Sequence, residues 1–178
     1  MYCIPDRLFH VEICCFQRFK NERTDTIIPL PDDLPFQFGA ELYIAENNLQ
    51  DKVIFLSEQP EAIASAAFQS AADFPAIYQM ATAMIYPSIF EGFGIPVLEA
   101  LCSRLPVITS NVSCLPETAG DAALYVNPDD EKEMAAAMFA IANDALLRKN
   151  LIEKGMVQAQ KFTVEKCAAA VMNVYTTL

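Results

Sequence analysis

Two glutamates with seven residues between them lie in the part of the sequence best suited to ligand binding. Glu91 precedes glycines at positions 92 and 94, and Glu99 follows Pro96. Glycines let backbone N–H groups approach a ligand closely, and proline is favoured at the start of a helix. Because free N–H groups at a helix N-terminus bind anions, this segment predicts a phosphate site beside two carboxylates.

The two carboxylates suit hydroxyl groups better than phosphate, because they would repel an anion. Hydroxyls at Glu91 and Glu99 together with phosphate at the N–H groups describe a nucleotide sugar. The spacing alone leaves a plainer alternative open. Glu99, placed in the first turn of a helix, would then complement the helix dipole, and Glu91 would be a solvated loop residue. A hydrolytic acid–base pair is less favoured, because a glutamate near a helix N-terminus accepts hydrogen bonds more readily than it donates protons.

The surrounding sequence alternates between apolar runs of strand length and longer stretches with helical spacing. The predicted strands are Leu8–Phe16, Leu34–Phe38, Val53–Leu56, Ala83–Tyr86, Pro106–Thr109 and Ala122–Val126. The predicted helices are Glu41–Asn48, Glu61–Ser70, Phe74–Thr82, Pro96–Arg104, Pro116–Ala119, Glu131–Asn143, Ala145–Lys161 and Val164–Thr177. This alternation predicts an α/β fold with a parallel sheet covered on both faces. Ligands bind such sheets beyond the carboxyl ends of the strands.

Length and composition restrict the class of protein. The 178 residues suit a single domain, and 53% hydrophobic residues supply a core. The net charge of −11 argues against a nucleic-acid partner. No apolar run is long enough to span a bilayer and no signal sequence is recognisable, so we expect a cytoplasmic protein with reduced cysteines. His10, the only histidine, is too isolated for a zinc site.

The E-x7-E segment and its neighbours resemble the large retaining GT-B glycosyltransferase family (glycosyltransferase family 4, glycosyl transferases group 1). The segment reads EGFGIPVLEA from Glu91. The flanking stretches Phe74–Thr82, Leu105–Ser110 and Leu115–Pro128 resemble the same family, and the likeness runs from about Phe74 to Leu178. It implies a Rossmann-like three-layer α/β/α domain over residues 1–178, forming the C-terminal, donor-binding half of a GT-B enzyme.

The resemblance also implies roles for individual residues around the motif. Glu99 would bind the nucleotide ribose, and Glu91 would contact hydroxyls of the donor sugar. Backbone N–H groups of Phe93, Gly94 and Ile95 would hold the sugar or the diphosphate.

The amino-terminal part departs from the family pattern. Lys20, followed by asparagine, matches the lysine that binds the diphosphate and assists catalysis, whereas Cys14 and Cys15 stand where a glycine and an arginine are common. Arg18 is a candidate for the missing positive charge or a solvated surface residue, and Ser57 is a candidate for the nucleobase contact.

The activity implied is transfer of a hexose from a nucleotide sugar to a glycan or lipid-linked acceptor, with retention of configuration and without metal or cofactor. The acceptor domain would lie outside this chain, so this half alone would bind donor but transfer poorly. A full enzyme could associate peripherally with membrane. The alternative function is a degenerate, non-catalytic Rossmann-like module used in assembly or regulation.

Overall fold

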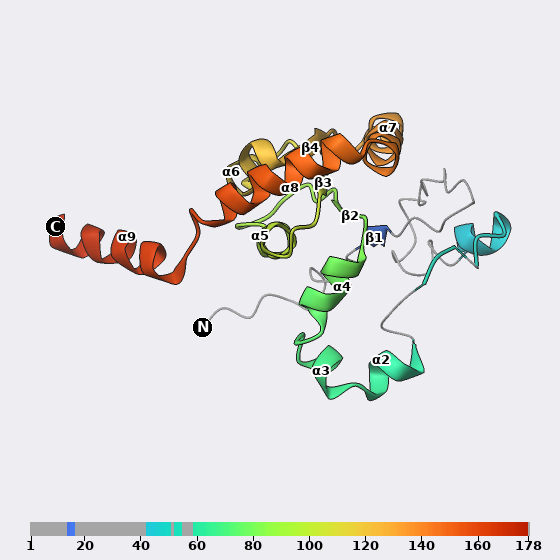
Figure 1. The fold of residues 1–178 in the computed structure, drawn as a ribbon, viewed down its shortest axis with the longest axis horizontal. Coiled ribbons are helices and arrows are strands. Elements are labelled where there is room, and N and C mark those ends of the chain that lie inside the picture. Colours follow the sequence, from blue (N-terminus) through green and yellow to red (C-terminus); the bar gives the residue numbers. More distant parts are fainter. Residues whose placement is uncertain (1–13, 17–41, 51, 55–58, 178) are drawn as a thin grey trace.

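The computed structural model describes residues 14–16, 42–50, 52–54 and 59–177, which include one four-stranded sheet (Figure 1). The strands lie in the order β1-β2-β3-β4. Their bounds are Cys14–Phe16 (β1), Ala83–Tyr86 (β2), Val107–Ser110 (β3) and Ala123–Val126 (β4). The strands β2, β3 and β4 are parallel, with Met84 opposite Val107 and Val107 opposite Ala123. The prediction of a parallel sheet is therefore confirmed for these three strands.

The first strand runs the other way. β1 pairs with β2 in antiparallel fashion, with Cys15 opposite Met84. The expectation of a parallel sheet therefore does not extend to this edge strand. An outer strand has only one hydrogen-bonded neighbour to satisfy, and antiparallel pairing is at least as stable as parallel pairing, so mixed sheets often carry such an edge strand.

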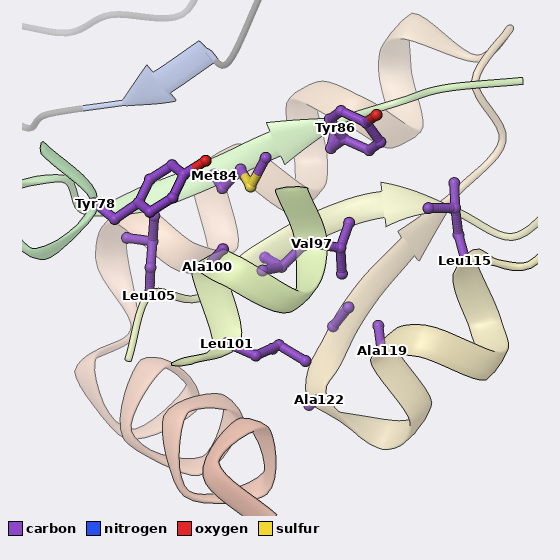
Figure 2. Close-up of a cluster of buried hydrophobic side chains, with 12 residues drawn as sticks. Tyr78, Met84, Tyr86, Val97, Ala100, Leu101, Leu105, Leu115, Ala119 and Ala122 are labelled. Carbon is purple, nitrogen blue, oxygen red and sulfur yellow. The ribbon is translucent and has the colours of Figure 1, made fainter. Parts of the chain in front are cut away.

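Side chains of the central strands alternate between two hydrophobic clusters, one on each face of the sheet. Met84 and Val107 belong to the cluster that contains residues of α5 (Ile95–Cys102) and α6 (Leu115–Ala119), which Figure 2 shows. Ala83 and Ile108 belong to the other cluster, which is covered by α7 (Glu131–Asn143). Strands buried on both faces favour continuous apolar runs. The three-layer α/β/α arrangement follows from this division.

Short helices precede the sheet's centre. Residues 42–46 are helical, as the prediction for Glu41–Asn48 requires. They are followed by α2 (Pro60–Ala64), α3 (Ala66–Gln69) and α4 (Phe74–Met80). The single helix predicted over Glu61–Ser70 is broken at Ser65, whose hydroxyl accepts a hydrogen bond of 3.1 Å from the Phe68 N–H and so caps α3. A serine that bonds to nearby backbone favours a cap over a helix interior.

The strand predicted at Val53–Leu56 is wrong for the two of its residues that the structure describes. Val53 and Ile54 lie in no strand, and Ile54 is 63% exposed. The edge of the sheet beside β2 is already paired with β1. A short apolar run in the sequence does not show which strand it pairs with, or whether it forms a strand at all. The strand predicted at Leu34–Phe38 and the first part of Leu8–Phe16 lie outside the described residues.

The three closing helices agree with prediction. They are α7, α8 (Ala145–Ala159) and α9 (Val164–Thr177). Earlier in the chain, a short 3-10 helix, η2 (Gly120–Ala122), precedes β4. Asp130 caps α7 and Asp144 caps α8 through side-chain oxygens. No residue of α9 is buried, and the helix extends away from the sheet (Figure 1). Within the described ranges, no helix combines the length and the apolar character needed to cross a bilayer.

Candidate functional site

The loop between β2 and α5 depends on one of its two glycines. Gly94 caps α5 with φ +84°, and a Cβ there would lie 2.8 Å from Leu115 Cδ2. Gly94 therefore meets both a conformational and a steric demand of the fold. Gly92 has no positive φ, and a Cβ added to it would meet nothing within 4 Å. The absence of a side chain at Gly92 leaves open space beside Glu91.

The carboxylate of Glu91 is anchored to the end of β2. The Tyr86 hydroxyl donates a hydrogen bond of 2.6 Å to Glu91 Oε1. Burial of the Tyr86 ring, together with this hydrogen bond to Glu91, raises the pKa of the phenol. Tyr86 consequently remains protonated, and remains a donor to the carboxylate, throughout the neutral pH range.

The turn after β3 holds the backbone of the same loop. Ser113 Oγ accepts a hydrogen bond of 3.2 Å from the Glu91 N–H and donates one of 2.9 Å to the Glu91 carbonyl. The Cys114 thiol lies 3.3 Å from that carbonyl and donates to it. The hydroxyl of Thr118 on α6 donates to the Phe93 carbonyl. The Glu91–Phe93 segment is therefore held from both sides, by β2 and by α6 with the turn before it.

Glu99 lies one residue further from the start of α5 than predicted, which places it just beyond the first turn. It is the fifth residue of a helix that begins at Ile95, and the first turn contains no acidic residue. The placement of Glu99 in the first turn is wrong, because Gly94 lets the helix start before Pro96. Since the effect of the helix dipole fades within one turn, the dipole no longer accounts for Glu99. Its Oε2 instead accepts a hydrogen bond of 3.1 Å from the Tyr78 hydroxyl on α4.

The backbone N–H groups of Phe93, Gly94 and Ile95 have no acceptor among the described residues. The Gly94 carbonyl already accepts from the N–H groups of Val97 and Leu98. The Phe93 ring packs edge-on against Phe162, with centroids 5.2 Å apart. Three consecutive donors at a helix N-terminus can bind an anion or a polar oxygen.

The position of α6 is set in turn by α8. Gln158 Nε2 donates hydrogen bonds of 2.8 Å and 3.1 Å to the carbonyls of Glu117 and Thr118. Lys161 Nζ donates one of 2.7 Å to Gln158 Oε1. These bonds satisfy carbonyls at the C-terminus of a helix only five residues long.

Sequence reasoning missed the residues that hold the two glutamates in place. These residues are Tyr78, Tyr86, Ser113, Thr118 and Gln158. The ring of Tyr78 also packs against that of Phe74. Only Tyr86, five positions before Glu91, is close enough in the chain for the sequence to suggest the contact, whereas Tyr78 lies 21 positions from Glu99.

Three predicted residues, Arg18, Lys20 and Ser57, lie outside the described residues. In the part of the chain that the structure describes, no three His, Cys, Asp or Glu side chains are gathered as metal ligands would be. Two hollows of about 540 Å³ and 370 Å³ lie along α9 and between α4, α7 and α8, respectively, and neither is lined by Glu91 or Glu99. Glu91 is half-buried and Glu99 is exposed.

A family model described as glycosyl transferases group 1 matches residues 16–158. The chain belongs to this family. The matched region contains both glutamates, their tyrosine partners and the turn that holds Glu91.

Two of the curated relatives are bacterial O-antigen mannosyltransferases. The chain is 41% identical over 145 residues to the O-antigen chain mannosyltransferase RfbU of Salmonella typhimurium, covering 79% of this chain and 38% of that protein. It is 39% identical over 106 residues to the O-antigen chain mannosyltransferase B of Escherichia coli, covering 60% and 28%. The chain thus spans well under half of the length of either relative.

A solved structure supports the fold. Sucrose-phosphate synthase from Thermosynechococcus elongatus matches with a TM-score of 0.63 and 28% identity. The match covers 78% of this chain and 33% of that one. The α/β Rossmann-like fold expected from the sequence is therefore confirmed.

Proposed function

We propose that this chain is the nucleotide-sugar-binding half of a retaining GT-B glycosyltransferase that transfers a hexose to a glycan or lipid-linked acceptor. The mannosyltransferase relatives make mannose the first sugar to test. The acceptor domain would lie outside residues 1–178, which accords with the short span of the relatives that the chain matches.

One observation carries the proposal: an anchored carboxylate lies on the same loop as three N–H groups that have no described acceptor. Tyr86 holds one oxygen of Glu91, and the described residues offer no partner to the other, Oε2. That oxygen can accept a hydrogen bond from a sugar hydroxyl. The N–H groups of Phe93, Gly94 and Ile95 can take a phosphate oxygen or a second hydroxyl. The open space at Gly92 leaves room for the ring.

The remaining donor contacts are assigned by the same proposal. Glu99 accepts hydrogen bonds from the ribose hydroxyls while Tyr78 holds its other oxygen. Lys20 and Arg18 neutralise the diphosphate, and Ser57 contacts the nucleobase. The assignment requires no metal, because lysine, arginine and backbone donors supply the positive potential that the leaving group needs.

The reaction would then proceed on one face of the sugar. The acceptor hydroxyl attacks the anomeric carbon on the face from which the nucleoside diphosphate departs, so configuration is retained. The bond from the anomeric carbon to phosphate oxygen breaks, and that oxygen takes the acceptor's proton. Lys20 and the loop N–H groups stabilise the negative charge that develops on the diphosphate.

Thermal unfolding with UDP, GDP, ADP and dTDP, each at about 1 mM, tests the proposal. A nucleotide present at about 100 times its dissociation constant should stabilise the fold by about 2.7 kcal/mol. In a domain of this size the melting temperature should rise by roughly 5–10 °C. We expect this shift with one nucleotide and its loss in Glu99→Ala. The matched control is Glu153→Ala, because Glu153 is an exposed glutamate on α8.

A wild-type chain that responds to none of the four nucleotides would contradict the proposal and favour a degenerate module. An equal shift in melting temperature for the wild type and Glu99→Ala would contradict only the assignment of Glu99 to the ribose. Once one nucleotide is identified, its mannose and glucose derivatives are compared by calorimetry to test the sugar.

A further inference from the structure

Ser113 combines an unusual backbone conformation with two hydrogen bonds to one distant residue. Its φ is +58°, in the left-handed region that glycine adopts without steric cost. Its hydroxyl accepts from the N–H of Glu91 and donates to the carbonyl of Glu91, 22 positions away in the chain. A glycine would suit the backbone better, but it would lack the hydroxyl. Serine at this position therefore tolerates the steric cost of a positive φ and supplies the hydroxyl that contacts Glu91.

The hydroxyl of Ser113 complements the contact made by Tyr86. Tyr86 holds Glu91 Oε1, whereas Ser113 holds the peptide groups on both sides of the Glu91 Cα. Fixing the backbone sets the direction of the Cα–Cβ bond, and fixing Oε1 sets the far end of the side chain. Together they define where Oε2 points. Cys114 adds a weaker contact to the carbonyl but leaves the N–H to Ser113.

We propose that Ser113 is a positioning residue that orients Glu91 toward the donor sugar. This inference rests on the proposed function and separates the residues that act on the sugar from those that act on the diphosphate. Ser113 acts on recognition of the sugar through Glu91. The proposal assigns the nucleoside diphosphate to Glu99, Lys20 and the loop N–H groups, and Thr118 rather than Ser113 holds the Phe93 carbonyl beside those groups.

Two substitutions of Ser113 separate the conformational role from the positioning role. Ser113→Gly relieves the positive φ but removes two exposed hydrogen bonds to Glu91, so the two effects oppose each other and the melting temperature should stay near that of the wild type. Ser113→Thr keeps the hydroxyl but places a β-branched residue at positive φ, so the melting temperature should fall. If Ser113 positions Glu91, affinity for the sugar nucleotide should fall in Ser113→Gly, which lacks the hydroxyl. It should be unchanged in Ser113→Thr, which keeps the hydroxyl but is less stable.

The measurement is calorimetric titration of the chain with GDP-mannose and GDP, and with UDP-glucose and UDP as the second pair. For the pair that the wild type binds, we expect Ser113→Gly to weaken sugar-nucleotide binding by about tenfold, the equivalent of one hydrogen bond to a charged site. Binding of the free diphosphate should stay within about twofold. Ser113→Thr should bind both ligands as the wild type does.

Equal affinity of Ser113→Gly and wild type for the sugar nucleotide would overturn the positioning role while leaving the proposed function intact. A parallel loss of affinity for the diphosphate and its sugar derivative in Ser113→Gly would also overturn it, since the effect would not be specific to Glu91. If the wild type binds none of the four ligands, the proposed function fails, and the positioning role fails with it.

Discussion

The Tyr86 hydroxyl lies 2.6 Å from Glu91 Oε1, which ties the first glutamate of the motif to the last residue of the central strand β2. Tyr86 is 2% exposed, so its ring is fixed by the core and its hydroxyl is a rigid support. Tyr78, also 2% exposed, supports Glu99 in the same way from α4. Each glutamate of the pair therefore accepts a hydrogen bond from a buried tyrosine, and the hydrophobic core sets the position of the polar surface.

Removing the phenol oxygen tests whether this support serves binding. In Tyr86→Phe the ring can keep its packing, and the loss of one hydrogen bond should cost about 1 kcal/mol of unfolding free energy. We expect sugar-nucleotide affinity to fall by roughly three- to tenfold, because Glu91 loses its orientation. Urea unfolding and calorimetric titration measure the two effects. Affinity equal to wild type would show that Tyr86 supports the fold alone.

Alanine substitutions at the two glycines of the loop should affect different properties, stability at Gly94 and binding at Gly92. Gly94→Ala places a Cβ 2.8 Å from Leu115 Cδ2 at φ +84°, so it should destabilise the fold by about 1–3 kcal/mol. Gly92→Ala meets no atom within 4 Å and should leave the melting temperature nearly unchanged. We expect Gly92→Ala to weaken sugar-nucleotide binding, because its methyl group enters the open space beside Glu91. Unaltered binding in stable Gly92→Ala would place the sugar elsewhere.

Tyr125 predicts a loss of stability at alkaline pH. Its hydroxyl donates a hydrogen bond of 2.5 Å to the Gly120 carbonyl, and burial, with the nearby charge of Asp121, raises its pKa to about 12. Because the folded pKa lies above the unfolded value of about 10, the neutral hydroxyl contributes stability in full below pH 10. That contribution is lost as the pH rises from about 10 to 12.

The test compares Tyr125→Phe with wild type in urea unfolding from pH 8 to 12. The stability difference between the two should narrow above pH 10, since the phenylalanine variant has no proton to lose at this site. Tyr175→Phe is the control, because Tyr175 lies exposed on α9. A constant difference across the range would contradict the assignment.

Gln158 should contribute strongly to the free energy of unfolding, although its side chain is polar. Replacing it in Gln158→Leu leaves the carbonyls of Glu117 and Thr118 without their donor. Two lost hydrogen bonds to buried or half-buried groups should lower the unfolding free energy by about 2–3 kcal/mol. Gln160→Leu, an exposed change two residues away, is the control. Urea midpoints that agree for both variants would refute the role of Gln158 in holding α6.

Local sequence patterns were sufficient for most elements near the site. The strand Ala83–Tyr86 and the helices Glu131–Asn143 and Val164–Thr177 have the predicted bounds. Each depends on neighbours a few positions away: an apolar run ended by proline for the strand, and a capping side chain, Asp130 or Thr163, before helical spacing for the two helices. The glutamate motif and its likeness to the glycosyltransferase family were also readable along the chain, because they lie within one loop and one helix.

The tertiary structure decided how those parts meet. The bonds from Ser113 to Glu91 and from Tyr78 to Glu99 join residues 22 and 21 positions apart, and no local pattern encodes such distances. The difference between Gly94 and Gly92 likewise depends on Leu115, which belongs to another helix. The direction of β1 was undetermined for the same reason, since a short apolar strand pairs equally well in either direction at an edge. Sequence specified the chemical groups, and packing of the sheet against its helices determined which of them touch.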